Sequence, residues 1–326
     1  MISLSALAAL HSEYADDLAL PVQPVTVGGV TIGAADPVLM GTVNLSRDST
    51  YRESVAVSTE AAIRKARTQI AQGAQVVDLG AESSTARARR VDGVQQRARL
   101  LPVVETLAEE CVVSVETYQP EVVEAVLAAG AQIVNLTGRD GEDEMLACAA
   151  SYDAAVVLCF CEPDDVRSPH DHPTATDALP YLLDHFGPRV EHARSLGVER
   201  VVIDPGLGFY YGNLVEPAVR VRHQAAVLAQ CFRLRSLGVP VCNALPHAFD
   251  LFEDEFRKAE GFFAVLARLG GTDLFRTHEV AHVRAVLKAM TLLDVQSLDV
   301  QSLDVQSLDV QSLDVQEPGE PSAQPR

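Results

Sequence analysis

Short runs rich in valine and isoleucine alternate with helix-like segments along most of the chain, and this alternation constrains the fold most strongly. Eight such runs occur, at residues 38–45, 75–80, 111–117, 132–138, 155–160, 200–204, 239–243 and 273–277. The segments between them have the apolar spacing of helices, and many end in a Gly-Ala or Leu-Gly pair that suits a helix C-cap. A strand followed by a helix, repeated eight times, predicts an α/β fold of the (β/α)8 TIM barrel type.

A doubly wound sheet also alternates strands with helices, but to hold a nucleotide it needs a glycine-rich turn after its first strand. No Gly-x-Gly-x-x-Gly follows Met40. The runs QVVDLG, QIVNLTG and RVVIDPG are nearly continuous in apolar residues, which is typical of strands buried on both faces. The pattern therefore favours the barrel.

The chain divides into three parts. Residues 1–35 form a short N-terminal lead-in, in which VTVGGVTIG predicts a small hairpin that closes the bottom of the barrel. Residues 36–292 form the barrel. From residue 293 to residue 326 the chain repeats LDVQS and then turns acidic and proline-rich, and a period of five matches neither a helix nor a strand. We expect a disordered C-terminal repeat tail, either a neutral product of repeat expansion or an arm that binds a partner.

Charge and composition exclude several classes of protein. The net charge of −19 would repel a phosphate backbone, so nucleic acid is not expected as a partner. No apolar run reaches the roughly 20 residues of a membrane span, and the amino terminus lacks the pattern of a secretory signal, which predicts a cytoplasmic protein. The six cysteines show no CxxC or CxxH spacing, which argues against disulfides and structural zinc.

Polar residues stand where the predicted strands end. In a barrel, the chemistry lies at the carboxyl ends of the strands. The polar residues at or just beyond these ends are Asn44, Asp78, Glu82, Glu116, Asn135, Asp204, His247, Arg276 and His278. Any one of them is unremarkable in a loop, but their convergence on one end of the barrel predicts a site.

Five blocks in these segments carry a family resemblance. MGTVNLSRDS, GAQVVDLGAESS, VSVETYQPEVVEAVLAAGAQIVNLTG, VVIDPGLGF and FRTHEV resemble, in this order and spacing, the pterin-binding barrels and most closely the dihydropteroate synthase family. The resemblance extends from about Pro37 to Met290. It implies a transferase of folate biosynthesis, in which p-aminobenzoate replaces the diphosphate of 6-hydroxymethyl-7,8-dihydropterin diphosphate.

The resemblance assigns the pterin to residues whose chemistry suits it. It places the pterin-binding residues of the family on Asp204, Asn135 and Glu116, the last replacing an Asp. A pterin ring presents an amidine-like donor edge and lactam acceptors, which carboxylates and carboxamides can read through paired hydrogen bonds. His247 stands where the family has a pterin-holding Lys.

The resemblance also assigns the diphosphate. Arg276 and His278 match the anion-holding Arg-x-His motif of the family, and Asn44 matches an Asn near the diphosphate and its Mg²⁺. Arg276 and His278 are two positions apart at a strand end, so we expect them to grip one anion from the same side. Cationic donors and Mg²⁺ suit a departing diphosphate because charge accumulates on its oxygens.

The departures from the family concern the second substrate. Pro246 and His247 replace the Arg and Lys of a Ser-Arg-Lys block, and Tyr210 adds bulk after the sixth strand. The loop with Ser84 and Thr85, expected to frame the aminobenzoate, also differs in sequence. The residues expected to bind the pterin are thus mostly kept, while those expected to bind the second substrate differ from the family.

Two functions stay open at this point. One is a dihydropteroate synthase-like transferase that joins the pterin to p-aminobenzoate or a related aromatic amine. The other is a noncatalytic pterin-binding paralogue, acting as a sensor, a carrier or the partner of a true synthase. A folate-dependent methyltransferase on the same barrel needs no diphosphate pair and is less favoured. The resemblance implies a homodimer.

Overall fold

The computed structural model describes residues 2–48, 51, 54–85, 88–174 and 177–293. Eight strands form one sheet in the order β8-β7-β6-β5-β4-β3-β10-β9, and each neighbouring pair is parallel. The strands are β3 (Val38–Asn44), β4 (Val76–Gly80), β5 (Val112–Thr117), β6 (Ile133–Leu136), β7 (Ala155–Cys159), β8 (Val201–Asp204), β9 (Cys242–Ala244) and β10 (Leu274–Thr277). A parallel bridge between Ile203 and Val241 joins the two ends of the sheet. The predicted barrel fold is thereby confirmed.

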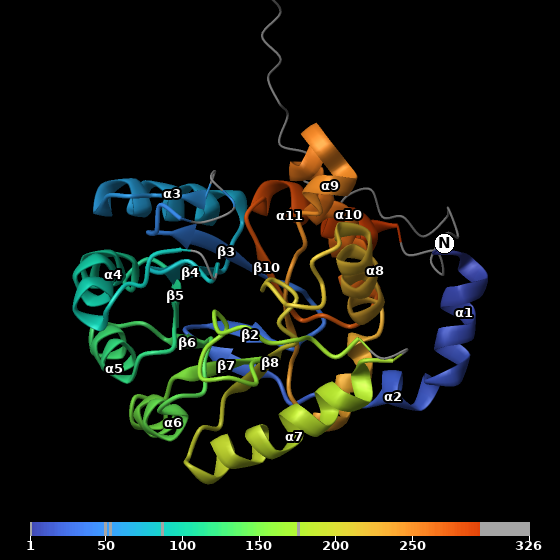
Figure 1. The fold of residues 1–326 in the computed structure, drawn as a ribbon, viewed down its shortest axis with the longest axis horizontal. Coiled ribbons are helices and arrows are strands. Elements are labelled where there is room, and N and C mark those ends of the chain that lie inside the picture. Colours follow the sequence, from blue (N-terminus) through green and yellow to red (C-terminus); the bar gives the residue numbers. More distant parts are fainter. Residues whose placement is uncertain (1, 49–50, 52–53, 86–87, 175–176, 294–326) are drawn as a thin grey trace, which may run out of the picture.

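Helices surround the strands (Figure 1). They are α3 (Thr59–Gln72), α4 (Gly93–Leu107), α5 (Pro120–Ala128), α6 (Glu142–Ser151), α7 (Leu179–Ser195), α8 (Pro217–Leu228), α10 (Phe256–Leu269) and α11 (Val280–Leu292), with η2 (Cys231–Leu237), α9 (Phe249–Phe252) and η3 (Glu253–Glu255) as short additions. Local signals set their ends: α3 begins where Ser58 Oγ accepts from Ala61 N at 3.2 Å and ends at Gly73, which has a left-handed φ of 108°.

The lead-in holds two helices besides the predicted hairpin. The strands β1 (Val25–Val27) and β2 (Val30–Ile32) pair antiparallel, and their turn uses Gly28 and Gly29, both at positive φ. A Cβ at Gly28 would lie 2.6 Å from the side chain of Val112, so the turn presses against the amino end of β5. This placement confirms the hairpin at the bottom of the barrel. The helices α1 (Leu4–Glu13) and α2 (Ala15–Ala19) precede it.

The predicted strand boundaries hold within two residues except in one strand. The run at 239–243 was expected to be the seventh strand, whereas β9 begins only at Cys242. Pro240 has no N–H to donate, and the N–H of Val241 donates to the side chain of Asp273 at 2.9 Å, so the ladder starts later. Residues 294–326, the repeat predicted to be disordered, lie outside the described residues.

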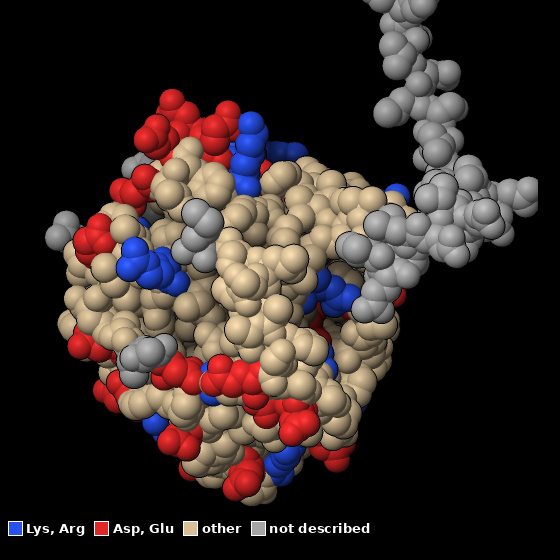
Figure 2. Space-filling view, turned by 90° about the vertical axis from the view of Figure 1, so that its right-hand side faces the viewer, with Lys and Arg blue, Asp and Glu red and all other residues tan. Residues whose placement is uncertain are grey.

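Acidic side chains outnumber basic ones in the chain. On the face shown in Figure 2, most of the surface is neither acidic nor basic, and acidic side chains gather toward its edges with basic ones among them; the net charge is −19. Among the described residues, no helix has the length and apolar character needed to cross a membrane.

Candidate active site

A buried network of polar side chains lies inside the barrel near the carboxyl ends of its strands. Arg276 donates from Nε to Asp78 Oδ2 at 2.7 Å and from Nη2 to Glu116. Asp78 also accepts from Ser114 Oγ at 2.7 Å and from Asn135 Nδ2 at 3.2 Å. Four strands, β4, β5, β6 and β10, thus contribute to one hydrogen-bonded group around a single guanidinium.

Strand register explains why these side chains meet. Asp78 is paired with Ser114 across β4 and β5, and Glu116 is paired with Asn135 across β5 and β6. Residues in register on neighbouring strands point to the same side of a sheet, which in a closed barrel is the interior. Sequence analysis named Asp78 among the polar strand ends but gave it no role, whereas the structure places it at the centre of the network.

Burial shifts the protonation of two carboxyl groups in this region. It raises the pKa of Glu116 to about 7, against the lowering effect of Arg276. It also raises the pKa of Asp204 to about 6, although the N–H of Gly206 and the charge of Arg276 oppose this shift. Burial alone would lower the pKa of Arg276, but Glu116 and Asp78 hold it above its ordinary value. Near neutral pH, small changes in pH or in the surroundings therefore change the protonation of Glu116 and Asp204.

A glycine turn fixes the carboxylate of Asp204. Its Oδ1 accepts from the N–H of Gly206 at 2.7 Å. Gly206 has a φ of 82°, and a Cβ there would lie only 2.3 Å from the hydroxyl of Tyr211. That hydroxyl in turn donates to the carbonyl of Gly206 at 2.8 Å. The turn therefore requires glycine, and it orients the side chain at the end of β8.

A cavity of about 110 Å³ opens beside the network and is lined by Arg276, His278 and His247. The Nη1 atom of Arg276 lies 4.0 Å from the position that a Cβ on Gly208 would occupy, and Gly208 lines the same cavity. Nε and Nη2 of the guanidinium thus bond to carboxylates, while Nη1 lies near this wall of the cavity. The structure therefore brings Arg276 and His278 to one cavity.

Sequence analysis missed Glu260, a buried carboxylate on α10. It lies 3.1 Å from Nδ1 of His278 and 3.3 Å from Nδ1 of His247. Burial alone would raise the pKa of Glu260, but the two histidines hold it below its ordinary value. Burial lowers the pKa of His278 to about 4. The available signal was a Glu in the helical pattern FRKAEGFFAVLARL, where Glu260 shares the apolar face with Phe263, Ala264 and Ala267.

Tyr51 covers the two histidines. Its ring centroid lies 4.4 Å from that of His278, with the rings stacked, and 4.5 Å from that of His247. Its hydroxyl donates to Glu279, and Arg257 also bonds to Glu279 at 2.8 Å. The ring of Tyr51 thus covers part of both imidazoles.

The other predicted site residues lie on the loops around the network. Asn44, at the end of β3, donates from Nδ2 to Ser54 Oγ at 2.5 Å, and its Oδ1 would lie 3.5 Å from a Cβ on Gly80. Ser84 lines a cavity of only about 10 Å³ together with Glu116, and Thr85 bonds to Ser83 at 3.1 Å. None of these hydrogen bonds joins Asn44, Ser84 or Thr85 to Arg276.

A buried ion pair ties two of these loops together. Glu82, after β4, pairs with Arg167 from the loop between β7 and α7. Glu82 also accepts from the hydroxyl of Tyr118 at 2.6 Å and from the N–H of Val91 at 3.0 Å. The contacts of Glu82 thus fix the loops, and we assign no substrate to this residue.

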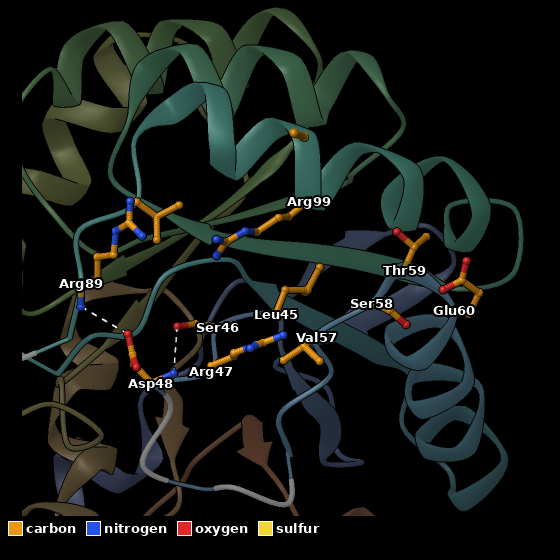
Figure 3. A pocket seen from close by; sticks show the side chains of 12 residues that line it. Leu45, Ser46, Arg47, Asp48, Val57, Ser58, Thr59, Glu60, Arg89 and Arg99 are labelled. Carbon is orange, nitrogen blue, oxygen red and sulfur yellow. Dashed lines mark hydrogen bonds between the residues drawn. The ribbon is translucent and has the colours of Figure 1, made fainter.

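A second, larger cavity of about 630 Å³ lies between the loops after β3 and β4. Three arginines reach it from separate segments: Arg47 after β3, Arg89 before α4, and Arg99 on α4 (Figure 3). Among the described residues, none of the three forms an ion pair with a carboxylate. Asp48 and Glu60 also line the cavity, so its lining has three arginines and two carboxylates, an excess of positive charge that suits an anionic ligand.

Known proteins resemble this chain in sequence. It is 28% identical over 266 residues to dihydropteroate synthase of Bacillus subtilis strain 168, covering 77% of this chain and 87% of that protein. It is also 28% identical over 269 residues to the dihydropteroate synthase of Synechocystis strain PCC 6803, with 78% and 89% covered.

Solved structures agree with these relatives. The Xanthomonas albilineans dihydropteroate synthase with 4-aminobenzoic acid superposes with a TM-score of 0.70 at 27% identity, over 85% of this chain and 99% of that one. The same enzyme in complex with 7,8-dihydropteroate gives 0.65 at 26% identity, over 84% and 99%. The sequence profile described as "Pterin binding enzyme" matches residues 40–278, which include every strand of the barrel except part of β3. The chain therefore belongs to the pterin-binding enzyme family.

Proposed function

We propose that this protein is a transferase of folate biosynthesis with dihydropteroate synthase chemistry. The amine nitrogen of p-aminobenzoate, or of a related aromatic amine, attacks the exocyclic methylene carbon of 6-hydroxymethyl-7,8-dihydropterin diphosphate. The bond from that carbon to oxygen breaks, diphosphate leaves with the electron pair, and the amine nitrogen loses a proton. The relatives with about 28% identity are named dihydropteroate synthases, and this supports the proposal.

The observation that carries it is the buried network around Arg276. A planar ligand with an amino-pyrimidine edge needs ionised carboxylates and a carboxamide at fixed positions, because its donors cannot be left unpaired in a buried site. Asp204, Glu116 and Asn135 offer these groups near the carboxyl ends of β8, β5 and β6. The raised pKa values of Glu116 and Asp204 mean that, without a ligand, the ionised forms of both side chains are less favoured than in water. A ring that donates hydrogen bonds to them would favour the ionised forms.

The diphosphate would lie against the cavity beside this network. Arg276 directs Nη1 toward that cavity, and His278 lines it. We assign both residues to the leaving group, where they would stabilise the charge that develops as the bond breaks. Asn44 offers a hard amide oxygen at the end of β3, which fits Mg²⁺ shared with substrate phosphate oxygens. When bound there, Mg²⁺ would neutralise part of the diphosphate charge.

The second substrate would bind between the loops after β3 and β4. The cavity between them carries Arg47, Arg89 and Arg99, which would hold the carboxylate of an aromatic amine. Ser84 and Thr85 lie in the same segment between β4 and α4 as Arg89, and Ser84 lines a small cavity together with Glu116. An amine held by these loops would approach the pterin from the side of β3 and β4.

One observation favours the noncatalytic alternative. His247, which replaces the pterin-holding Lys of the family, lies 3.3 Å from the buried carboxylate of Glu260 and is thus committed to that carboxylate. A paralogue that has lost this contact could bind a pterin without turning it over.

One pair of measurements separates the two functions. We would incubate the protein with the pterin diphosphate and p-aminobenzoate, follow dihydropteroate by chromatography, and titrate the same preparation with pterin diphosphate alone. Formation of dihydropteroate, and rescue of a bacterium that lacks its own synthase, supports the transferase. Binding of the diphosphate without product supports the carrier or sensor. We further propose that the protein acts in the cytoplasm as a homodimer.

A further inference from the structure

We infer that His247, Glu260 and His278 form a binding site for one divalent transition-metal ion, with zinc as the ion whose preferences they match best. The three residues come from separate segments: the loop after β9, the middle of α10 and the end of β10. One ligand atom from each lies within 4.8 Å of the others, and no other such group of His, Cys, Asp and Glu is found in the described part of the chain. Two imidazoles and one carboxylate are a frequent zinc set. The inference does not depend on the proposed transferase function.

The distances between ligand atoms already approach those around a bound ion. Zinc lies about 2.0–2.2 Å from imidazole nitrogens and carboxylate oxygens, so tetrahedral ligand atoms lie roughly 3.3–3.6 Å apart. Here Oε1 of Glu260 lies 3.1 Å from Nδ1 of His278 and 3.3 Å from Nδ1 of His247. The ligand nitrogens of the two imidazoles lie within 4.8 Å of each other, and rotations that bring them closer would complete the arrangement.

One buried nitrogen of the group has only the Glu260 carboxylate close to it. Nδ1 of His247 lies 3.3 Å from Glu260 Oε1, but no well-formed hydrogen bond joins this nitrogen to a described residue. A buried polar atom without a well-formed hydrogen bond costs free energy. A metal ion between this nitrogen and the carboxylate would give it a ligand bond.

The carboxylate is oriented as metal ligands usually are. Glu260 Oε2 accepts from the N–H groups of His278 and Glu279, both at 3.1 Å, and from the hydroxyl of Thr277. Oε1 lies next to both imidazoles and also accepts from the N–H of His278 at 3.2 Å. Hydrogen bonds behind a ligand fix its direction and support metal affinity.

The charge of Glu260 lacks a strong cation nearby. Its side chain is 1% exposed, and its ion-pair partners among the described residues are the two histidines alone. The arginines in neighbouring segments pair with other acids: Arg257 with Glu279, and Arg276 with Asp78 and Glu116. A buried carboxylate is costly unless a cation balances it, and a divalent ion in this position would do so.

The surroundings leave one side of the site open. The rings of Tyr51 and Phe249 lie 4.5 Å and 5.3 Å from that of His247. His247 and His278 line the cavity that Phe249 and Arg276 also line. Three protein ligands with a fourth position open to a cavity is the arrangement of zinc sites that bind water or an anion.

The test uses the full chain after metal removal. Titration with Zn²⁺ alone should show one ion per chain, and Co²⁺ should give the intense visible bands of a tetrahedral ion. His247→Gln should lower the zinc affinity by about 100-fold or more, since it removes one of three ligands. His247 is partly exposed, so this variant should fold, and Glu260→Gln provides a second measurement if its melting curve stays cooperative.

Two control variants make the result decisive. His192→Gln removes a histidine that also contacts a carboxylate, Asp143, at 2.6 Å, but at the surface and without a second histidine, so it should keep the zinc affinity. Asn44→Ala should keep it too, which separates this site from the Mg²⁺ proposed at Asn44. Zinc binding that His247→Gln leaves unchanged, or weakens no more than His192→Gln does, would overturn the inference. Loss of binding in His247→Gln alone supports it, whether or not the protein makes dihydropteroate.

Discussion

Arg276 on β10 reaches Glu116 on β5 across the interior of the barrel. In the sheet, β3 and β4 lie between these two strands, so the ion pair spans the lumen. The pair therefore depends on closure of the barrel and holds the guanidinium beside the cavity that we assign to the diphosphate.

If Arg276 binds the diphosphate, its removal should lower the affinity for pterin diphosphate more than the affinity for the bare pterin. Arg276→Ala should remove a charge-assisted contact worth roughly 1.5 to 3 kcal/mol from pterin diphosphate and much less from the bare pterin. Calorimetry with both ligands measures this. Arg276→Lys serves as a control, because it keeps the charge but loses the planar fork. Equal weakening of both ligands in Arg276→Ala would place the guanidinium away from the diphosphate.

The pterin assignment predicts a loss of affinity in Asp204→Asn. The amide keeps the shape of the side chain but has one acceptor oxygen, so a buried ring donor loses its partner. This costs about 1 to 3 kcal/mol, or a fivefold to hundredfold loss of pterin affinity. Fluorescence titration gives the affinity, and a melting curve confirms the fold. Unchanged affinity would remove the pterin from this end of β8.

The same carboxylate predicts a pH dependence of binding. The pKa of Asp204 in the free protein is about 6, and a ring donor needs the ionised form. Pterin affinity should therefore fall below that value and approach a tenfold loss per pH unit, and Asp204→Asn should lose this component. Glu116, with a pKa of about 7, should add a fall that begins at higher pH in both proteins. Titrations from pH 5 to pH 8 would show both. The same slope below pH 6 in both proteins would assign that part of the titration to another group.

Glu116 predicts how the free energy of unfolding varies with pH. Its pKa in the folded protein, about 7, lies above the ordinary value of 4.5. The folded state therefore binds the proton more tightly, and the free energy of unfolding should fall as pH rises from about 4.5 to about 7, by up to roughly 3 kcal/mol. Glu116→Gln should flatten this part of the curve in urea denaturation. Asp204 would still contribute a smaller fall at lower pH.

Gly206 allows a test of local strain with an internal control. Gly206→Ala combines a left-handed φ of 82° with a Cβ placed 2.3 Å from the hydroxyl of Tyr211. Gly29→Ala has a similar φ of 81° with no atom within 4 Å of the new Cβ. Both should lose about 1 kcal/mol or more from backbone strain, and Gly206→Ala should lose more. Equal losses in urea denaturation would show that Tyr211 moves aside freely.

We expect the C-terminal LDVQS repeat to contribute nothing to the stability of the barrel. Because the helix α11 extends to Leu292, the truncation should follow Leu293. A chain that ends there should keep its melting temperature and its pterin affinity. A clear drop in melting temperature would mean that residues 294–326 contact the barrel.

The sequence was most informative where a local pattern determines the structure. Continuous apolar runs predicted seven of the eight strands within two residues, because a strand buried on both faces has little choice of composition. The seventh strand shifted since one side-chain acceptor, Asp273, takes the N–H of Val241. The helices α1 and α2 were not predicted, as no apolar face on them is buried.

The site was only partly predictable for a similar reason. Strand-end residues are visible in the sequence, and their resemblance to a family suggested their roles. The contacts of Arg276 with Glu116 and Asp78 depend on which strands face each other across the closed barrel, and no local spacing encodes that. Glu260 lies inside a helix, far from any strand end, so a search of strand ends passes over it.

The hairpin at the base of the barrel has a consequence for the order of events in the reaction. Its turn presses on β5 through Gly28 and Val112, and Val25, Val27 and Ile32 are buried beneath the strands. Side chains fill the interior of such a barrel, and the hairpin covers its base, so small molecules must arrive and depart at the end where Arg276 lies. If the pterin occupies the buried network and the amine the loops outside it, as proposed, the pterin should bind before the amine, and diphosphate should leave before the joined product.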